Sequence, residues 1–390
     1  MACATNIFEN DTRYGYNDLT SDVMTTDCTP SDLSTPAKLQ GILSPSAFKT
    51  VEFTLDCGFR PLLFFLGAPT NILNMIVFAR QGLRDRMNLC LFSLAVADLF
   101  YVTSKFVMAS YCFVGDLDPF LREVWKFTVR KYAVACVFAT LYSSGALTMI
   151  IAVERCVCVV FPMKAANTMK TRTMAALIVL SVVIVCGLCS VYVLKYDVKV
   201  DYVSSDDSFV TLKASQTYLR HKVSIDVIEN VVLSSITFVN FVIVSMATVI
   251  TVVKLKHAMT WRKARGTVTS AEQRHVTLVK MLVTVSCIYI TCTAPTISVA
   301  LVRMLVPEFW PQRRYHGMYF VAHIAATVVL MVNSSVNFFV YVTQSSRFRV
   351  ELRALVCVTK DAEKKALNGS LSNPHRPDLS SSGSFSRRAK

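Results

Sequence analysis

Hydrophobic positions gather into seven long stretches along this chain, and polar residues are concentrated between them. A helix needs about 20 mostly apolar residues to cross the hydrocarbon core of a bilayer, and each stretch is long enough. The clustering of apolar residues into long runs therefore indicates membrane-spanning helices. We predict them at Phe59–Ala79, Met87–Cys112, Phe127–Phe161, Thr173–Leu194, Val227–Val253, Val276–Met304 and Gly317–Thr343.

Two further elements are expected outside these spans. The connection Lys195–Asp226 contains "VKVDYVSSDDSFVTLKA", two short β-like runs around a turn, which predicts a hairpin. In residues 344–357, apolar side chains recur at helical spacing on one face and arginines fall elsewhere, which predicts a short amphipathic eighth helix on the membrane. The predicted fold class is an all-α membrane protein. It comprises a tail over 1–58, a seven-helix bundle over 59–343, the eighth helix, and a disordered cytoplasmic tail over 358–390.

Composition agrees with a membrane protein. Hydrophobic residues make up 53% of the chain and charged residues 17%, against about 25% charged in a typical soluble domain. The net charge of +15 raises the possibility of nucleic-acid binding, but no soluble basic domain exists to bind it. We therefore expect no nucleic-acid partner. The thirteen cysteines show no metal-ligand spacing.

The basic residues also predict the orientation of the chain. The connections after the first, third and fifth spans are rich in Lys and Arg, so they should face the cytoplasm. The acidic N-terminal segment is then extracellular and the basic C-terminal segment cytoplasmic, in the plasma membrane. Asn10 begins a glycosylation sequon on the extracellular side. The first residues do not read as a signal peptide, so we expect the first helix to direct insertion.

Several polar side chains fall inside the predicted spans, where they are costly and therefore point to function. A lone Asn71 or Ser144 needs only a hydrogen bond to a neighbouring helix. Asp98 is different, because no Lys or Arg stands close to it in its own helix. A cation or a proton should accompany this carboxylate.

An ordered set of motifs resembles the rhodopsin-like (class A) G-protein-coupled receptors. In chain order the motifs are "NILN" with Asn71, "LAVAD" with Asp98, "ERCVCVVFP" from Glu154 to Pro162, "CTAP" at Cys292–Pro295, "NFFVY" at Asn337–Tyr341, and Phe348 seven residues on. The resemblance extends from Phe59 to Cys357. Within this class, the stretches "RQGLRDRMNLCLFSLAVADLFY" and "NSSVNFFVYVTQSSRFR" most resemble molluscan chemosensory receptors. Invertebrate neuropeptide receptors of the FMRFamide type are the next most similar group.

The resemblance implies roles for the matching residues. It implies a sodium ion held between helices two, three and seven by oxygen ligands, which a hard cation prefers: Asp98, Ser144, Asn333 and Asn337. It implies an activation switch in which Arg155 pairs with Glu154 at rest, Pro295 lets the sixth helix bend, and Tyr341 moves beneath Arg155. Asn71, Pro162 and Phe348 would be structural. The implied partners are a heterotrimeric G protein, then arrestin and a receptor kinase on the tail, and membrane lipid through palmitoylation of Cys357.

The chain also departs from the family. Arg130 stands where the usual disulfide cysteine of helix three is expected, and Lys195–Asp226 contains no cysteine. A different pair among Cys28, Cys57 and Cys112 is possible, and the sequence does not select one. Thr293 replaces the usual tryptophan of helix six, and Phe338 replaces the proline after Asn337.

These departures bear on the ligand. Val137 replaces the amine-binding Asp of monoamine receptors, and Met331 replaces the retinal-binding Lys of opsins, so neither class fits. We expect the ligand pocket around Val137, Thr293, Met331 and His323. The outer helix ends are basic, which suits an anionic ligand or, equally, a solvated rim.

We predict that the protein is a receptor that binds an extracellular ligand and activates a heterotrimeric G protein. The predicted ligand is a chemosensory cue. No phosphate-binding loop, metal motif or nucleophile elbow indicates an enzyme. A neuropeptide receptor of the same fold is one alternative. A seven-helix channel or transporter that uses Asp98 as an ion site is another, although no internal repeat is evident.

Overall fold

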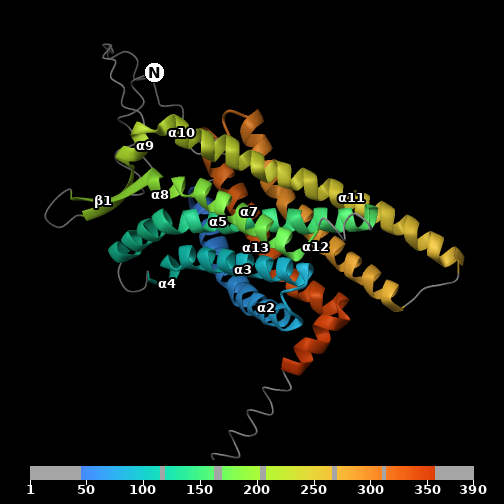
Figure 1. The fold of residues 1–390 in the computed structure, drawn as a ribbon. Helices are drawn as coiled ribbons and strands as arrows, with labels where there is room; N and C mark the ends of the chain where they lie inside the picture. Colours follow the sequence, from blue (N-terminus) through green and yellow to red (C-terminus); the bar gives the residue numbers. More distant parts are fainter. Residues whose placement is uncertain are drawn as a thin grey trace, which may run out of the picture.

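A computed structural model describes residues 45–114, 119–161, 169–202, 208–265, 270–309 and 313–355. Within these ranges it contains seven helices long and apolar enough to cross a membrane, which confirms the predicted seven-helix bundle. Figure 1 shows the long helices running side by side. The predictions for Asn10, Cys28, Pro162 and Cys357 lie outside the described residues.

The first span is longer than expected, because helix begins at Pro45 and continues to Gln81 through a wider π-helical segment. The helical segments are α1 (Pro45–Phe53), η2 (Thr54–Phe59), α2 (Arg60–Gln81), α3 (Arg86–Ala109), α4 (Tyr111–Val114), α5 (Pro119–Val160), α7 (Thr171–Cys189), α8 (Val191–Lys195), α9 (Gln216–Arg220), α10 (Lys222–Val227), η3 (Ile228–Leu233), α11 (Ser234–Arg265), α12 (Ser270–Leu305) and α13 (His316–Gln344). Residues 346–355 are also helical.

The turn between α2 and α3 shows why these two helices become antiparallel neighbours. Gly82 ends α2 with φ of 95°, a backbone conformation that a side chain would disfavour. Asp85 then caps α3, and its carboxylate accepts hydrogen bonds from the backbone N–H groups of Met87 at 2.8 Å and Asn88 at 3.4 Å. A short, well-capped connection leaves the two helices packed against each other.

The predicted hairpin is present. Strands β1 (Tyr196–Tyr202) and β2 (Ser208–Ala214) pair antiparallel, with Tyr196 opposite Ala214. The hairpin lies at one end of the bundle, beside α8 and α9 (Figure 1). We call this end the outer end, and the end that carries the basic connections the inner end.

A disulfide and an ion pair are among the contacts that hold the outer end together. The disulfide Cys57–Cys112 joins η2 to α4 across a sequence separation of 55, which resolves the pairing that the sequence left open. Lys131 of α5 donates to Asp197 of β1 at 2.8 Å. This ion pair ties the hairpin to the third span, the two elements that the family's usual disulfide would join.

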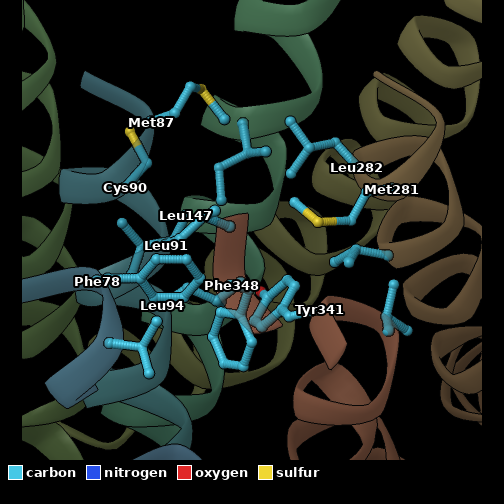
Figure 2. Close-up of a cluster of buried hydrophobic side chains, with 14 of the residues drawn as sticks. Phe78, Met87, Cys90, Leu91, Leu94, Leu147, Met281, Leu282, Tyr341 and Phe348 are labelled. Atoms are coloured by element: carbon cyan, nitrogen blue, oxygen red, sulfur yellow. The ribbon is translucent and has the colours of Figure 1, made fainter. Parts of the chain in front are cut away.

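The largest hydrophobic cluster lies toward the inner end. Figure 2 shows Phe78, Tyr341 and Phe348 gathered in it, together with Met281 and Leu282 of α12. The ring of Phe348 lies 5.5 Å from that of Phe78 and 5.7 Å from that of Tyr341. The helix over residues 346–355 is therefore anchored in the bundle by its third residue.

Candidate functional site

Asp98 joins three spans through one carboxylate. Its side chain is fully buried, with 0% exposure. Its Oδ1 accepts hydrogen bonds from the hydroxyls of Ser144 on α5, at 2.7 Å, and Ser334 on α13, at 2.8 Å. Its Oδ2 accepts from Nδ2 of Asn337 on α13, at 2.9 Å. The predicted link between Asp98, Ser144 and Asn337 is thus a set of direct hydrogen bonds.

Asn71 extends this cluster to the first span. Its Nδ2 donates to the backbone carbonyls of Gly67, at 2.9 Å, and Ser334, at 2.8 Å. Asn74, one turn further along α2, is also buried and donates to Oδ1 of Asn71 at 3.4 Å. The short side chain of Asn71 therefore connects α2 to α13 directly beside Asp98.

Ser334, which the sequence analysis did not include in the sodium site, contacts Asp98 directly. Asn333 is buried, yet no hydrogen bond among the described residues joins it to Asp98. Successive residues of a helix point about 100° apart, so only one of the two can face the carboxylate. The motif spacing alone did not reveal which face of α13 turns inward.

The oxygen atoms around Asp98 suit a hard monovalent cation. Oδ1 of Asn337 is buried and has no hydrogen-bond partner, although the same side chain contacts Asp98. The hydroxyls of Ser144 and Ser334 add neutral oxygens, and hard cations prefer oxygen ligands. With one carboxylate in the cluster, a single positive charge is balanced.

Glu154 and Arg155 form a buried ion pair at the inner end of α5. Oε2 of Glu154 faces Nε of Arg155, as the resting pairing requires. Its other oxygen, Oε1, contacts Nε of Arg86 at 3.0 Å. Arg86 in turn donates to the backbone carbonyl of Met169 at 2.7 Å. Arg86 was not predicted as a site residue, because its place in a basic connection was explained by membrane orientation alone.

The other two predicted switch residues, Pro295 and Tyr341, lie in the sixth and seventh spans. Pro295 lies inside α12 and has no N–H for the carbonyl of Thr291, four residues earlier. This missing hydrogen bond favours a bend in the sixth span. Tyr341 is buried, with its ring 5.2 Å from that of Phe78.

The four predicted ligand-pocket residues differ in whether they line a pocket. Thr293 lines a small pocket with Tyr289 and Asn240, between α5, α11 and α12. Val137 and Met331 are buried in the hydrophobic cluster around Tyr101 and Val102, which adjoins this pocket through Leu141 and Leu330.

His323 lies nearer the outer end, stacked on Tyr319 at 5.9 Å. Of the four predicted residues, only Thr293 lines the pocket between α5, α11 and α12.

Comparison with known proteins agrees with this arrangement. The family described as "7 transmembrane receptor (rhodopsin family)" matches residues 70–341. The chain is also 24% identical, over 293 residues, to the allatostatin-A receptor of the silk moth Bombyx mori, covering 72% of this chain and 73% of the relative. The family is one of receptors and not of enzymes. This chain therefore belongs to the rhodopsin family of seven-transmembrane receptors.

Proposed function

We propose that this receptor binds an extracellular ligand and, when activated, catalyses nucleotide exchange on a heterotrimeric G protein. The observation that carries the proposal is the buried Glu154–Arg155 pair at the inner end. A buried ion pair is weak evidence for stability, because desolvation opposes its attraction. A role as a switch that opens on activation explains why the pair is placed there.

Activation then follows from two states of one bundle. In the resting state Glu154 holds Arg155, and the polar contacts of Asp98 hold α3, α5 and α13 together. A bend at Pro295 moves the inner end of α12 outward and frees Arg155 to face the G protein. A ligand drives this change only to the extent that it binds the open state more tightly than the closed state.

Asp98, Ser144, Ser334 and Asn337 form the proposed sodium site. The support is the buried carboxylate, the two hydroxyls, and the unpaired Oδ1 of Asn337. The cation stabilises the resting arrangement, because it is held by groups from three spans at once. Asn333, included on sequence grounds, is left out of this set.

A peptide is the first candidate ligand. The support is the Bombyx mori relative, which is an allatostatin-A receptor, and the hairpin at the outer end, where a peptide would arrive. A small chemosensory cue is the second candidate. The small pocket that Thr293 and Asn240 help to line favours it, since that pocket suits a small molecule better than a peptide.

The remaining proposals concern the cell surface. We place the receptor in the plasma membrane, with glycosylation at Asn10 and palmitoylation at Cys357, and with arrestin and a receptor kinase acting on the C-terminal segment. Membrane insertion is supported by α7, whose apolar side chains Val179, Leu180, Val183 and Ile184 are exposed and available to lipid.

A signalling experiment tests the proposed function. The receptor is expressed with a promiscuous G protein and exposed to pooled amidated and free-acid peptides, amino acids and water-borne odorants. We expect ligand-dependent GDP release, and we expect Arg155→Ala to reach the surface but lose it. Normal signalling by Arg155→Ala would overturn the assigned role. Ligand-independent ion flux through the purified protein would favour a channel or transporter instead.

A further inference from the structure

Lys105 is a buried lysine that forms no ion pair among the described residues. It lies in the outer half of α3, two turns from Asp98, and its exposure is 6%. Among the described residues it makes no hydrogen bond or ion pair, and its nearest aromatic contact is the Tyr101 ring, 5.9 Å from Nζ. Burying an ammonium group without an anionic partner is costly, so an anion is expected to reach it.

The acidic group nearest to Lys105 is already engaged. Asp56 of η2 forms an ion pair with Arg60 at 2.9 Å and accepts a hydrogen bond from Tyr111 at 3.3 Å. Arg60 is also 6% exposed, and together with Asp56 and Arg130 it is one of the charged groups that act electrostatically on Lys105. Buried positive charge therefore exceeds negative charge here.

Two further donors at this place lack acceptors. The hydroxyl of Tyr101 has no hydrogen-bond partner although Tyr101 is 0% exposed, and Nε of Arg60 is likewise buried and unpaired. Lys105 lies one turn after Tyr101 on α3, and Leu63, three residues after Arg60, packs in the same hydrophobic cluster as Tyr101. Together with the Lys105 ammonium, these unpaired donors match a group that accepts hydrogen bonds.

The surrounding chain is arranged to hold these groups in place. Asp56 and Arg60 flank the end of the π-helical segment η2, and such wide turns are frequent at functional sites. The disulfide Cys57–Cys112 fixes this segment to α4, next to the Tyr111–Asp56 hydrogen bond.

We propose that Lys105, Arg60 and Tyr101 form the binding site for a carboxylate group of the activating ligand. This inference rests on the proposed receptor function and adds the chemical class of the ligand. The carboxylate pairs with Lys105 and accepts hydrogen bonds from Tyr101 and Arg60. It is supplied either by a small free acid or by the C-terminal carboxylate of a peptide.

The test measures binding separately from signalling. Purified full-length receptor is heated with two panels of probes, each acid matched with its uncharged amide. One panel contains small carboxylates from acetate to decanoate and benzoate, and the other contains short peptides with free or amidated C-termini. We expect acids of one panel, and not their amides, to raise the unfolding temperature, which also identifies the source of the carboxylate.

Lys105→Met removes the charge while keeping the length of the side chain. We expect its affinity for the active acid to fall roughly 30-fold or more, because a buried charge loses its partner. Without ligand it should unfold at or above the wild-type temperature, since an unpaired ammonium is gone. Lys105→Arg, which retains the charge, should retain much of the affinity. The matched control is Lys126→Met, whose lysine already pairs with Glu52 at 3.7 Å and which should bind normally.

Three outcomes would overturn the inference: no acid in either panel stabilises the wild type, amides bind as well as acids, or Lys105→Met binds the acid normally. GDP release on the G protein is measured with the same probes. Charge-dependent binding without any GDP release would contradict the proposed function and leave the carboxylate site standing, so the two failures are distinguishable.

Discussion

Glu154 is held by two arginines that come from different parts of the chain. Arg155 is its neighbour on α5, whereas Arg86 begins α3 and also contacts the backbone carbonyl of Met169. Arg86 therefore fixes the carboxylate at the place where it faces Arg155.

Replacing Arg86 by glutamine should raise ligand-independent signalling a few-fold. The Glu154 carboxylate loses the contact that positions it, so Arg155 is released more often. Basal GDP exchange, normalised to surface expression, measures the effect. Arg84→Gln is the matched control, because Arg84 lies in the same connection with an exposed side chain. Equal basal activity in both variants would remove Arg86 from the switch.

Replacing Asp98 by asparagine should abolish the dependence of agonist affinity on sodium. The neutral side chain keeps the size of Asp98 but loses the charge that balances the cation. Agonist binding is compared in sodium and in choline salts of equal ionic strength. Ser144→Ala, which removes one neutral oxygen ligand, should only weaken the dependence. An undiminished sodium effect in Asp98→Asn would contradict the proposed site.

At the scale of elements, α2 and α13 approach closely enough to exclude a side chain. A Cβ atom added at Gly67 would lie 2.5 Å from the hydroxyl and 3.3 Å from Cβ of Ser335. The carbonyl of Gly67 also accepts the hydrogen bond of Asn71. This contact positions the first span against the seventh, immediately beside the Asp98 cluster.

Gly67→Ala should therefore destabilise the receptor, by about 1–3 kcal/mol as for other overpacked cores. Thermal unfolding in detergent measures the loss. Gly187→Ala on α7 is the control, because an added Cβ there meets nothing within 4 Å and alanine favours helix. A wild-type unfolding temperature for Gly67→Ala would show that α2 and α13 can separate without cost.

The elements could be predicted more completely than their contacts. Apolar runs of membrane length determine the seven spans, and turn residues between two β-like runs predict the hairpin. The role of Ser334 in place of Asn333 depends on the rotation of α13, and the contact of Arg86 with Glu154 depends on two helix ends meeting. The excess of buried positive charge around Lys105 can be recognised only once Asp56 is seen to pair with Arg60. None of these three facts is encoded in local spacing.

At the scale of the whole molecule, polar contacts occur at three depths of the bundle. The basic site around Lys105 lies in the outer half, the Asp98 cluster lies further in, and the Glu154 pair lies at the inner end. Lys105 and Asp98 stand two turns apart on α3, so a ligand group at the outer site acts on the helix that carries the Asp98 cluster. One rigid helix can thus transmit a change between them.

The Lys131–Asp197 pair gives the outer end a property that a disulfide would not give it. The side chains of the pair are 18% and 45% exposed, so dissolved ions reach both. The Debye length falls from about 30 Å at 0.01 M salt to about 3 Å at 1 M. The hairpin is consequently held firmly to α5 in dilute surroundings and loosely in brine. We therefore expect salt to loosen the contact between the hairpin and α5.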